Sequence, residues 1–211
     1  GFGGAAALHM LRKEIGEENW KKSIHYFLKI NGGKPVTTKD FIHAVEFTTG
    51  KSLQWFFDQW FYSIGYPQFI VTKKYDSNSG TLKLIVEQTQ IPDTTTNYNK
   101  IRFFQGKIQI AIDNIVYDKR IEAQPINEFT FEVKNNPSLV NFDFNGTWLK
   151  KLTFDKSNEE LLYQLQKDND IVGRQWALAQ LANKFRDNLT TDQDRVKICN
   201  ALLDVMQSDC Y

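Results

Sequence analysis

Apolar residues recur at helical spacing through the first 62 residues, in segments separated by breaks that contain glycine. This spacing predicts helices over about 5–15, 17–30, 37–49 and 52–62. The third helix opens with Thr37 and Asp40 in a capping-box pattern. The last helix has large apolar side chains on one face, which indicates a packed core and not a ligand site. These side chains are Leu53, Phe56, Phe57 and Trp60.

At Gly65-Tyr66-Pro67 the helical period gives way to alternation of apolar and polar residues, which continues to about Phe154. The alternating runs are short, and clusters of Asn, Asp, Gly and Pro separate them. The runs cover residues 69–71, 82–86, 108–112, 129–133 and 140–144. Short alternating strands at this spacing predict an antiparallel β-sandwich of about seven strands.

Helical spacing returns from Ser157 onward, and the last predicted helix opens with Thr191 and Asp194 in a capping-box pattern. Antiparallel helices joined by a short polar turn are typical of an α-solenoid of the HEAT-like kind. A lone pair of such helices cannot bury both faces, so we expect more helices beyond Tyr211. The predicted fold class is α+β in three parts. These are a helical bundle segment over 1–66, an antiparallel β-sandwich over 67–155 and the start of a helical repeat over 156–211.

Charge and hydropathy exclude two classes of partner. The 211 residues include 26 basic and 25 acidic ones, for a formal net charge of +1. A duplex DNA binder usually gathers positive charge on one face. Here we find only short lysine pairs of the kind seen on solvated surfaces, such as those at 21–22, 73–74 and 150–151. No apolar run approaches the roughly 20 residues that span a bilayer. We therefore expect neither nucleic acid nor a membrane span.

The start of the sequence does not identify a cellular compartment. The opening Gly1-Phe2-Gly3-Gly4 has no initiator Met and runs directly into helical sequence, so we expect it to begin inside a longer protein. Localisation therefore stays unknown.

Cys199 and Cys210 lie eleven positions apart, which is about 16 Å along a helix. A disulfide requires a Cα separation below roughly 7 Å. We therefore predict free thiols, buried or incidental.

The sequence predicts neither a catalytic nor a metal-binding residue within the chain. The histidines His9, His25 and His43 have no second His at i+4, so an H-E-x-x-H helix is absent. Asp40, His43 and Glu46 share a polar helix face, but surface charge pairing makes the same pattern. Gly1 to Ala6 fit a dinucleotide fingerprint without its strand context. Two glycosylation acceptor patterns, at 145–147 and 188–190, decide nothing without a compartment.

Several stretches together resemble one family. Residues 4–12 (GAAALHMLR) and 15–20 (IGEENW) are similar to the segment that follows the zinc site in aminopeptidase N-like gluzincin peptidases. The similarity continues through residues 36–41 (VTTKDF), then Phe56-Phe57 with Trp60, and it ends at Gly65-Tyr66-Pro67. It covers about 65 residues in order. The family also follows this helical lobe with a β-sandwich and a helical solenoid, as in the pattern described above.

The resemblance implies a parent protein that is a zinc metallo-aminopeptidase, a hydrolase that removes N-terminal residues from peptides with a metal-activated water. The family's zinc ligands and general base would lie upstream, so we expect zinc in the parent and no cofactor in this chain. The family's oxyanion-stabilising Tyr falls on Gly1 and its following Lys on Gly3. The partners implied are the upstream catalytic domain of the same polypeptide and the peptide substrates of the parent. Substrate-binding residues stay unknown.

An alternative hypothesis gives the chain no catalytic parent. A β-sandwich with helical repeats can serve as a scaffold or protein-binding module. An H-E-x-x-H helix encoded upstream would favour the peptidase, and its absence would favour the scaffold. Carbohydrate binding by the sandwich has only generic aromatic residues in its favour, and Trp148 is as easily explained as a buried residue.

Overall fold

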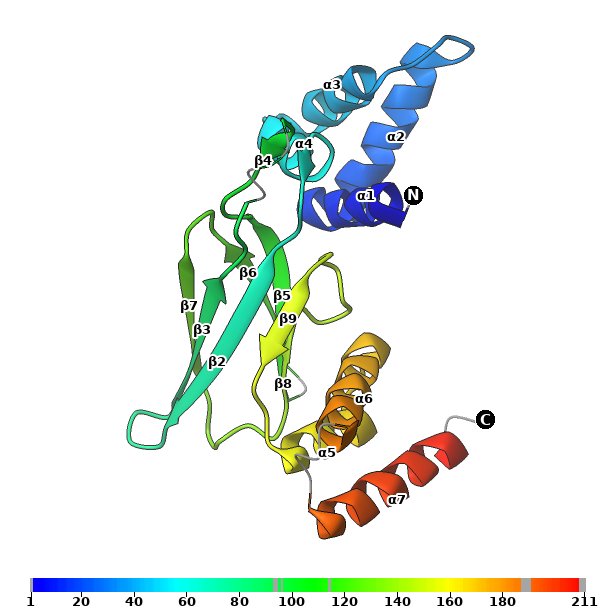
Figure 1. Cartoon of the computed structure of the whole chain (residues 1–211). Helices are drawn as coiled ribbons and strands as arrows, with labels where there is room; N and C mark the ends of the chain where they lie inside the picture. The colour runs from blue at the N-terminus through cyan, green and yellow to red at the C-terminus, as the bar shows by residue number, and fades with distance from the viewer. Residues whose placement is uncertain (1, 93–94, 96, 114, 187–190, 209–211) are drawn as a thin grey trace.

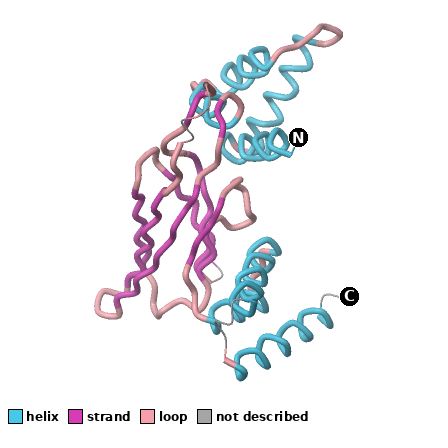
Figure 2. Tube along the Cα trace, viewed as in Figure 1, coloured by secondary structure: helices cyan, strands magenta, loops and turns pink. Residues whose placement is uncertain are grey.

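A computed structural model describes residues 2–92, 95, 97–113, 115–186 and 191–208. Helices come first, strands second and helices again last, which confirms the predicted α+β class and the order of its parts. Figures 1 and 2 show the N-terminal helices at one end of the sheets, and the C-terminal helices toward the other end. No helix in the part of the chain that the structure describes is long and apolar enough to cross a membrane.

The N-terminal helices are α1 (Phe2–Ile15), α2 (Glu17–Asn31), α3 (Thr38–Thr49) and α4 (Gln54–Trp60). The capping box predicted for α3 is confirmed: the Thr37 side chain accepts the N–H of Asp40, whose carboxylate accepts the N–H of Thr37. The apolar faces of α1, α3 and α4 form one buried cluster, which includes the aromatic pair Phe56 and Phe57 of α4. The aromatic stripe is therefore core, as predicted.

Two sheets follow. One has the strand order β7-β3-β2-β9, with bounds β2 Gln68–Asp76, β3 Thr81–Gln88, β7 Ile126–Glu132 and β9 Lys151–Phe154. The other has the order β6-β5-β8, with bounds β5 Gly106–Ile112, β6 Ile115–Ile121 and β8 Val140–Phe142. A short parallel pair joins β1 (Ser63–Ile64) to β4 (Asn99–Lys100).

The expectation of a purely antiparallel arrangement is wrong at one edge. Strand β9 pairs with β2 in parallel, with Phe69 opposite Leu152. The chain must leave β8 and cross to the other sheet before it reaches α5, and this crossing brings it alongside β2 in the same direction.

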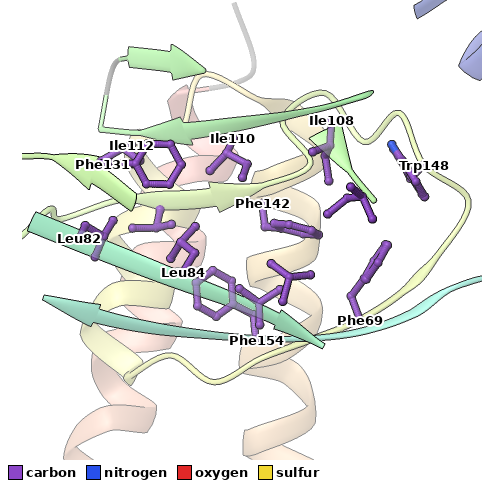
Figure 3. Packing of buried hydrophobic residues seen from close by; sticks show 14 of the residues in the cluster. Phe69, Leu82, Leu84, Ile108, Ile110, Ile112, Phe131, Phe142, Trp148 and Phe154 are labelled. Carbon is purple, nitrogen blue, oxygen red and sulfur yellow. The ribbon is translucent and has the colours of Figure 1, made fainter. Parts of the chain in front are cut away.

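The two sheets share one hydrophobic core (Figure 3). Phe69, Leu82 and Leu84 come from the first sheet, and Ile110 and Phe142 come from the second. Each of these side chains is at most 3% exposed. Because alternate residues of a strand point to one face, the alternating runs of the sequence supply these inward side chains. Trp60 of α4 and Trp176 of α6 also pack against this core, so helices on either side are joined to the sheets.

The C-terminal helices are α5 (Asn158–Lys167), α6 (Ile171–Arg186) and α7 (Asp192–Ser208). A capping box that the sequence analysis did not identify starts α5, with Ser157 as N-cap and Glu160 as its partner. Thr191 accepts the N–H of Asp194 at the start of α7, as that pattern predicted. Leu161, Leu181 and Ile198 meet in a small separate core.

Candidate functional site

The carboxylate–imidazole group on α3 has separate structural roles. Hydrogen bonds from the Thr37 side chain and backbone hold the pKa of the exposed Asp40 carboxyl below its usual range. Glu46 accepts the N–H of Leu53, at 2.7 Å, and so fixes the start of α4. The exposed His43 ring stacks on Phe47, with 6.2 Å between ring centroids. The exposed His43 matches the interpretation of this helix face as solvated surface. The half-buried Glu46 instead accepts the N–H of Leu53, which the sequence did not predict.

The histidines do not converge. His9, His25 and His43 are exposed on three different helices. Within the ranges that the structure covers, no group of three His, Cys, Asp or Glu side chains is arranged to hold a metal ion. The described residues therefore do not fit the zinc that the resemblance implies for the parent. Position 1, where the family's Tyr would fall, lies outside the described residues.

The structure describes one of the two cysteines and one of the two glycosylation acceptor patterns. Cys199 is a free, exposed thiol on α7, and Cys210 lies outside the described residues. The acceptor pattern at 188–190 also lies outside them. In the pattern at 145–147, Asn145 is exposed, but Thr147 is buried and its N–H donates to Asp143. Trp148 is 6% exposed, so it is a core residue.

The densest polar cluster joins the sheets to α5 and α6. We call it the junction network, and all of its residues but one are buried. The exception is the Lys150 side chain, at 13%. The network consists of Asn141, Asp143, Lys150, Lys156, Gln164, Asp168 and Asp170. Perturbed ionisable groups gathered at one place are candidates for a functional site, although structural ion pairs give the same signal.

Asp143 is the acceptor at the sheet side of the network. Its carboxylate accepts the N–H groups of Thr147 and Trp148 at 3.1 and 2.9 Å. It also pairs with the Lys150 ammonium at 2.5 Å. Burial raises the pKa of the Asp143 carboxyl, although Lys150 and the two N–H groups act in the opposite direction. The carboxylate therefore closes the turn that places Trp148.

Asp168 and Asp170 close the network on the helix side. The Asn141 side chain donates to both carboxylates, at 2.9 Å each. Gly173 leaves the necessary room, because a Cβ atom there would lie 2.4 Å from an Asp168 oxygen. Burial raises the pKa of Asp168. These contacts fix the start of α6 against β8.

The cavity inside the junction network is small, at about 60 Å³, and its lining includes Asp143, Lys150, Lys156 and Trp176. Small-molecule pockets usually measure about 300 Å³ or more. A cavity of this size holds a water molecule or two but excludes a peptide. The contacts of the network connect the sheets to α5 and α6.

The interpretation of the lysine pairs as solvated surface is wrong at two positions. The Lys150 side chain is 13% exposed and the Lys73 side chain 19%, and they pair with Asp143 and Glu160 respectively. Lys22 of the first pair does match the expectation, with a side chain that is 59% exposed. Neighbouring elements of the fold shield the Lys73 and Lys150 side chains from solvent. The pattern of charges along the sequence does not show this shielding.

A second polar contact joins α1 to the sheets. The Glu14 side chain is 10% exposed. Its carboxylate accepts the N–H of Lys107 on β5 and an N–H of Arg120 on β6, both at 2.7 Å. The Arg120 guanidinium also lies over the Trp55 ring. One carboxylate therefore holds the N-terminal helices to both strands of a hairpin.

We expect Glu14→Gln to lower the free energy of unfolding by about 1–2 kcal/mol, because two charge-assisted hydrogen bonds weaken and the Arg120 charge loses its partner. Urea unfolding followed by tryptophan fluorescence measures the change. Glu128→Gln removes an exposed ion pair with Lys83 and serves as the matched control, with little expected effect. Equal losses in the two variants would contradict a special role for Glu14.

Three larger hollows lie on the surface. One, of about 300 Å³, is lined by residues that include Tyr66 and Gln90, beside the β1–β4 pair. Another, of about 290 Å³, runs between α6 and α7, with Leu181 in its wall. The third, also of about 290 Å³, has Glu160 in its wall, and this carboxylate already pairs with Lys73 and caps α5.

The sequence analysis identified neither Glu14, Asp143 nor Lys156. Asp143 carried a weak signal, because it interrupts the apolar run 140–144 just before the turn at Asn145-Gly146. Glu14 and Lys156 carried none, since their partners lie far away in the sequence or on other elements.

Comparisons with known proteins give a consistent result, although no family model matches the chain. The chain is 26% identical over 210 residues to aminopeptidase N of Haemophilus influenzae. This match covers 90% of this chain and 23% of that protein. It is 28% identical over 136 residues to the tricorn protease-interacting factor F2 of Thermoplasma volcanium. This second match covers 62% of this chain and 17% of that protein.

A solved structure agrees in fold. Aminopeptidase A of Legionella pneumophila, in complex with aspartic acid, superimposes with a TM-score of 0.77 at 24% identity. The match covers 95% of this chain and 24% of that one. The chain thus spans about a quarter or less of the length of the proteins that it matches. These sequence and structure matches support the resemblance of the chain to aminopeptidase N-like peptidases.

Proposed function

We propose that this chain is a non-catalytic portion of a zinc-dependent aminopeptidase, C-terminal to the zinc site. One observation carries the proposal: nearly the whole chain matches about a quarter of two aminopeptidases. In this proposal the parent removes N-terminal residues from peptides, with its zinc and general base on polypeptide upstream of Phe2.

Each part of the chain has a proposed role in that parent. Residues 1–66 form the C-terminal helical lobe of a thermolysin-like catalytic domain and supply one wall of its cleft. Residues 67–155 form a β-sandwich that acts as a spacer, supported by the hydrophobic core that the two sheets share. Residues 156–211 begin a HEAT-like helical domain, supported by the apolar groove that α6 and α7 leave open. Glu14 and the junction network fix the two boundaries of the spacer.

The isolated chain is expected to bind no stoichiometric zinc and to leave aminoacyl-nitroanilides uncleaved. Metal analysis of the purified protein and an absorbance assay measure both properties. Turnover by the pure chain that a chelator abolishes would contradict the proposal. The reason is geometric, since the described His, Cys, Asp and Glu residues form no metal-binding group.

The decisive experiment uses the longer protein encoded by the same reading frame. We expect it to bind about one zinc ion per chain and to hydrolyse aminoacyl-nitroanilides, because an H-E-x-x-H helix upstream would supply ligands and base. A longer protein that folds but contains neither zinc nor activity would favour the alternative of a scaffold or protein-binding module.

A further inference from the structure

Lys156 lies in the short connection between β9 and α5, and its side chain contacts both parts. The amine donates to the backbone oxygen of Val140 on β8 at 2.5 Å, and to the side-chain oxygen of Gln164 on α5 at 2.6 Å. It also lies over the rings of Phe154 on β9 and Trp176 on α6, at 4.7 and 5.3 Å. The residue is only 4% exposed. One side chain thus touches two strands and two helices.

We propose that Lys156 is a proton-controlled pin, whose uncharged amine holds α5 and α6 against the sheets and whose protonation loosens them. The donor count supports this role. An uncharged amine has two N–H donors, and the amine has two acceptors among the described residues. An ammonium has a third N–H and a full charge, both of which favour water over a buried site. The inference does not depend on the proposed function.

The electrostatics agree with this geometry. Burial lowers the pKa of Lys156 to about 7, the nearby Lys73 adds to this effect, and Asp168 opposes it. Once α5 and α6 separate from the sheets, the amine regains its ordinary pKa of 10.5. Between about pH 7 and pH 10.5 the docked state therefore binds fewer protons than the open state, so docking strengthens as the pH rises. Below about pH 6 both states are protonated and the dependence flattens.

Other charged groups lie near Lys156 on β2, α5 and α6. Lys73 of β2 pairs with Glu160 of α5, and Lys184 of α6 donates to the backbone oxygen of Lys156. The remaining groups belong to the junction network: Asp143, Lys150, Asp168 and Asp170. Because burial raises the pKa of Asp143 and Asp168, the test must separate these carboxyls from the amine. The three histidines lie on α1, α2 and α3, away from this junction.

Amide hydrogen exchange of the full chain measures the opening directly. After correction for the intrinsic exchange rate at each pH, the opening constant of the α5 and α6 amides is expected to fall roughly tenfold from pH 6 to pH 8. Amides of β3, in the middle of its sheet, serve as the internal reference and should show no such change. An opening constant of α5 and α6 that stays constant, or rises with pH, overturns the proposal.

Variants of the junction test which group takes up the proton that controls the opening of α5 and α6. Lys156→Met has a similar length without a charge and should leave α5 and α6 protected independently of pH. Lys83→Met, at an exposed position on β3, is the matched control and should keep the wild-type dependence. If the dependence persists in Lys156→Met and disappears in Asp168→Asn, the carboxyl is responsible and the proposal is wrong. Should Lys156→Met fail to fold, a carbon-13 titration of the wild-type lysines decides: a Lys156 midpoint near pH 7 supports the pin, and one above about 10 refutes it.

Discussion

Asp143→Ala is expected to lower the free energy of unfolding by about 3–5 kcal/mol, among the largest effects of any single substitution in this chain. The Asp143 side chain is fully buried, and the change leaves three donors without their acceptor. The N–H groups of Thr147 and Trp148 stay buried in the turn, while the Lys150 ammonium loses its counter-ion. Urea unfolding measures the loss.

Two further variants separate hydrogen bonding from charge. Asp143→Asn keeps one side-chain oxygen that can accept an N–H, so its loss of stability should be clearly smaller than that of Asp143→Ala. Lys150→Met leaves the carboxylate unpaired, but the raised pKa of Asp143 lets that group take up a proton. The stability of Lys150→Met should therefore recover as the pH falls toward that pKa, and Asp143→Ala should show no such recovery. Equal losses in the alanine and asparagine variants would contradict the role given to the two N–H groups.

Local patterns predicted the elements well, because their causes are local. The box of Thr37 and Asp40 involves residues three positions apart, so the sequence alone shows it. Alternation along β2 and β3 reports directly which side chains face the core. The parallel pairing of β9 with β2 had no such signal, since it joins residues more than 80 positions apart.

The polar contacts between parts could not be predicted for a related reason. The sequence around Lys73 and Lys150 is that of a solvated surface. Whether such a lysine meets water or a buried carboxylate depends on how α5 and α6 dock, and docking is a property of the whole fold. The same holds for Glu14, whose partners Lys107 and Arg120 lie on a hairpin about 100 residues away. Polar residues that fix domain positions are therefore the hardest to identify from one sequence.

Trp148→Ala is expected to cost about 3–5 kcal/mol and to weaken the cooperation between the N-terminal helices and the sheets. The indole N–H donates to the backbone oxygen of Lys107 at 2.6 Å. The ring meets Trp60 of α4 edge-on at 5.7 Å and Phe69 of β2 at 5.6 Å between centroids. The substitution thus opens a large cavity at the boundary between the two parts and removes the indole donor from the Lys107 backbone oxygen.

A double-mutant cycle tests whether this boundary couples the parts. Trp148→Phe keeps a ring but loses the N–H donor, so it should cost only part of the alanine effect. Trp60→Ala, combined with Trp148→Ala, should give a coupling energy of about 0.5–1.5 kcal/mol for the edge-on ring pair. We expect α1 to α4 to open together with β2 and β3 in the wild type, and amide exchange of Trp148→Ala should show them opening independently. A coupling energy near zero, with joint opening preserved, would place the connection elsewhere. The Glu14 contact with β5 and β6 and the Gln59 contact with Gln105 would then be the next links to remove.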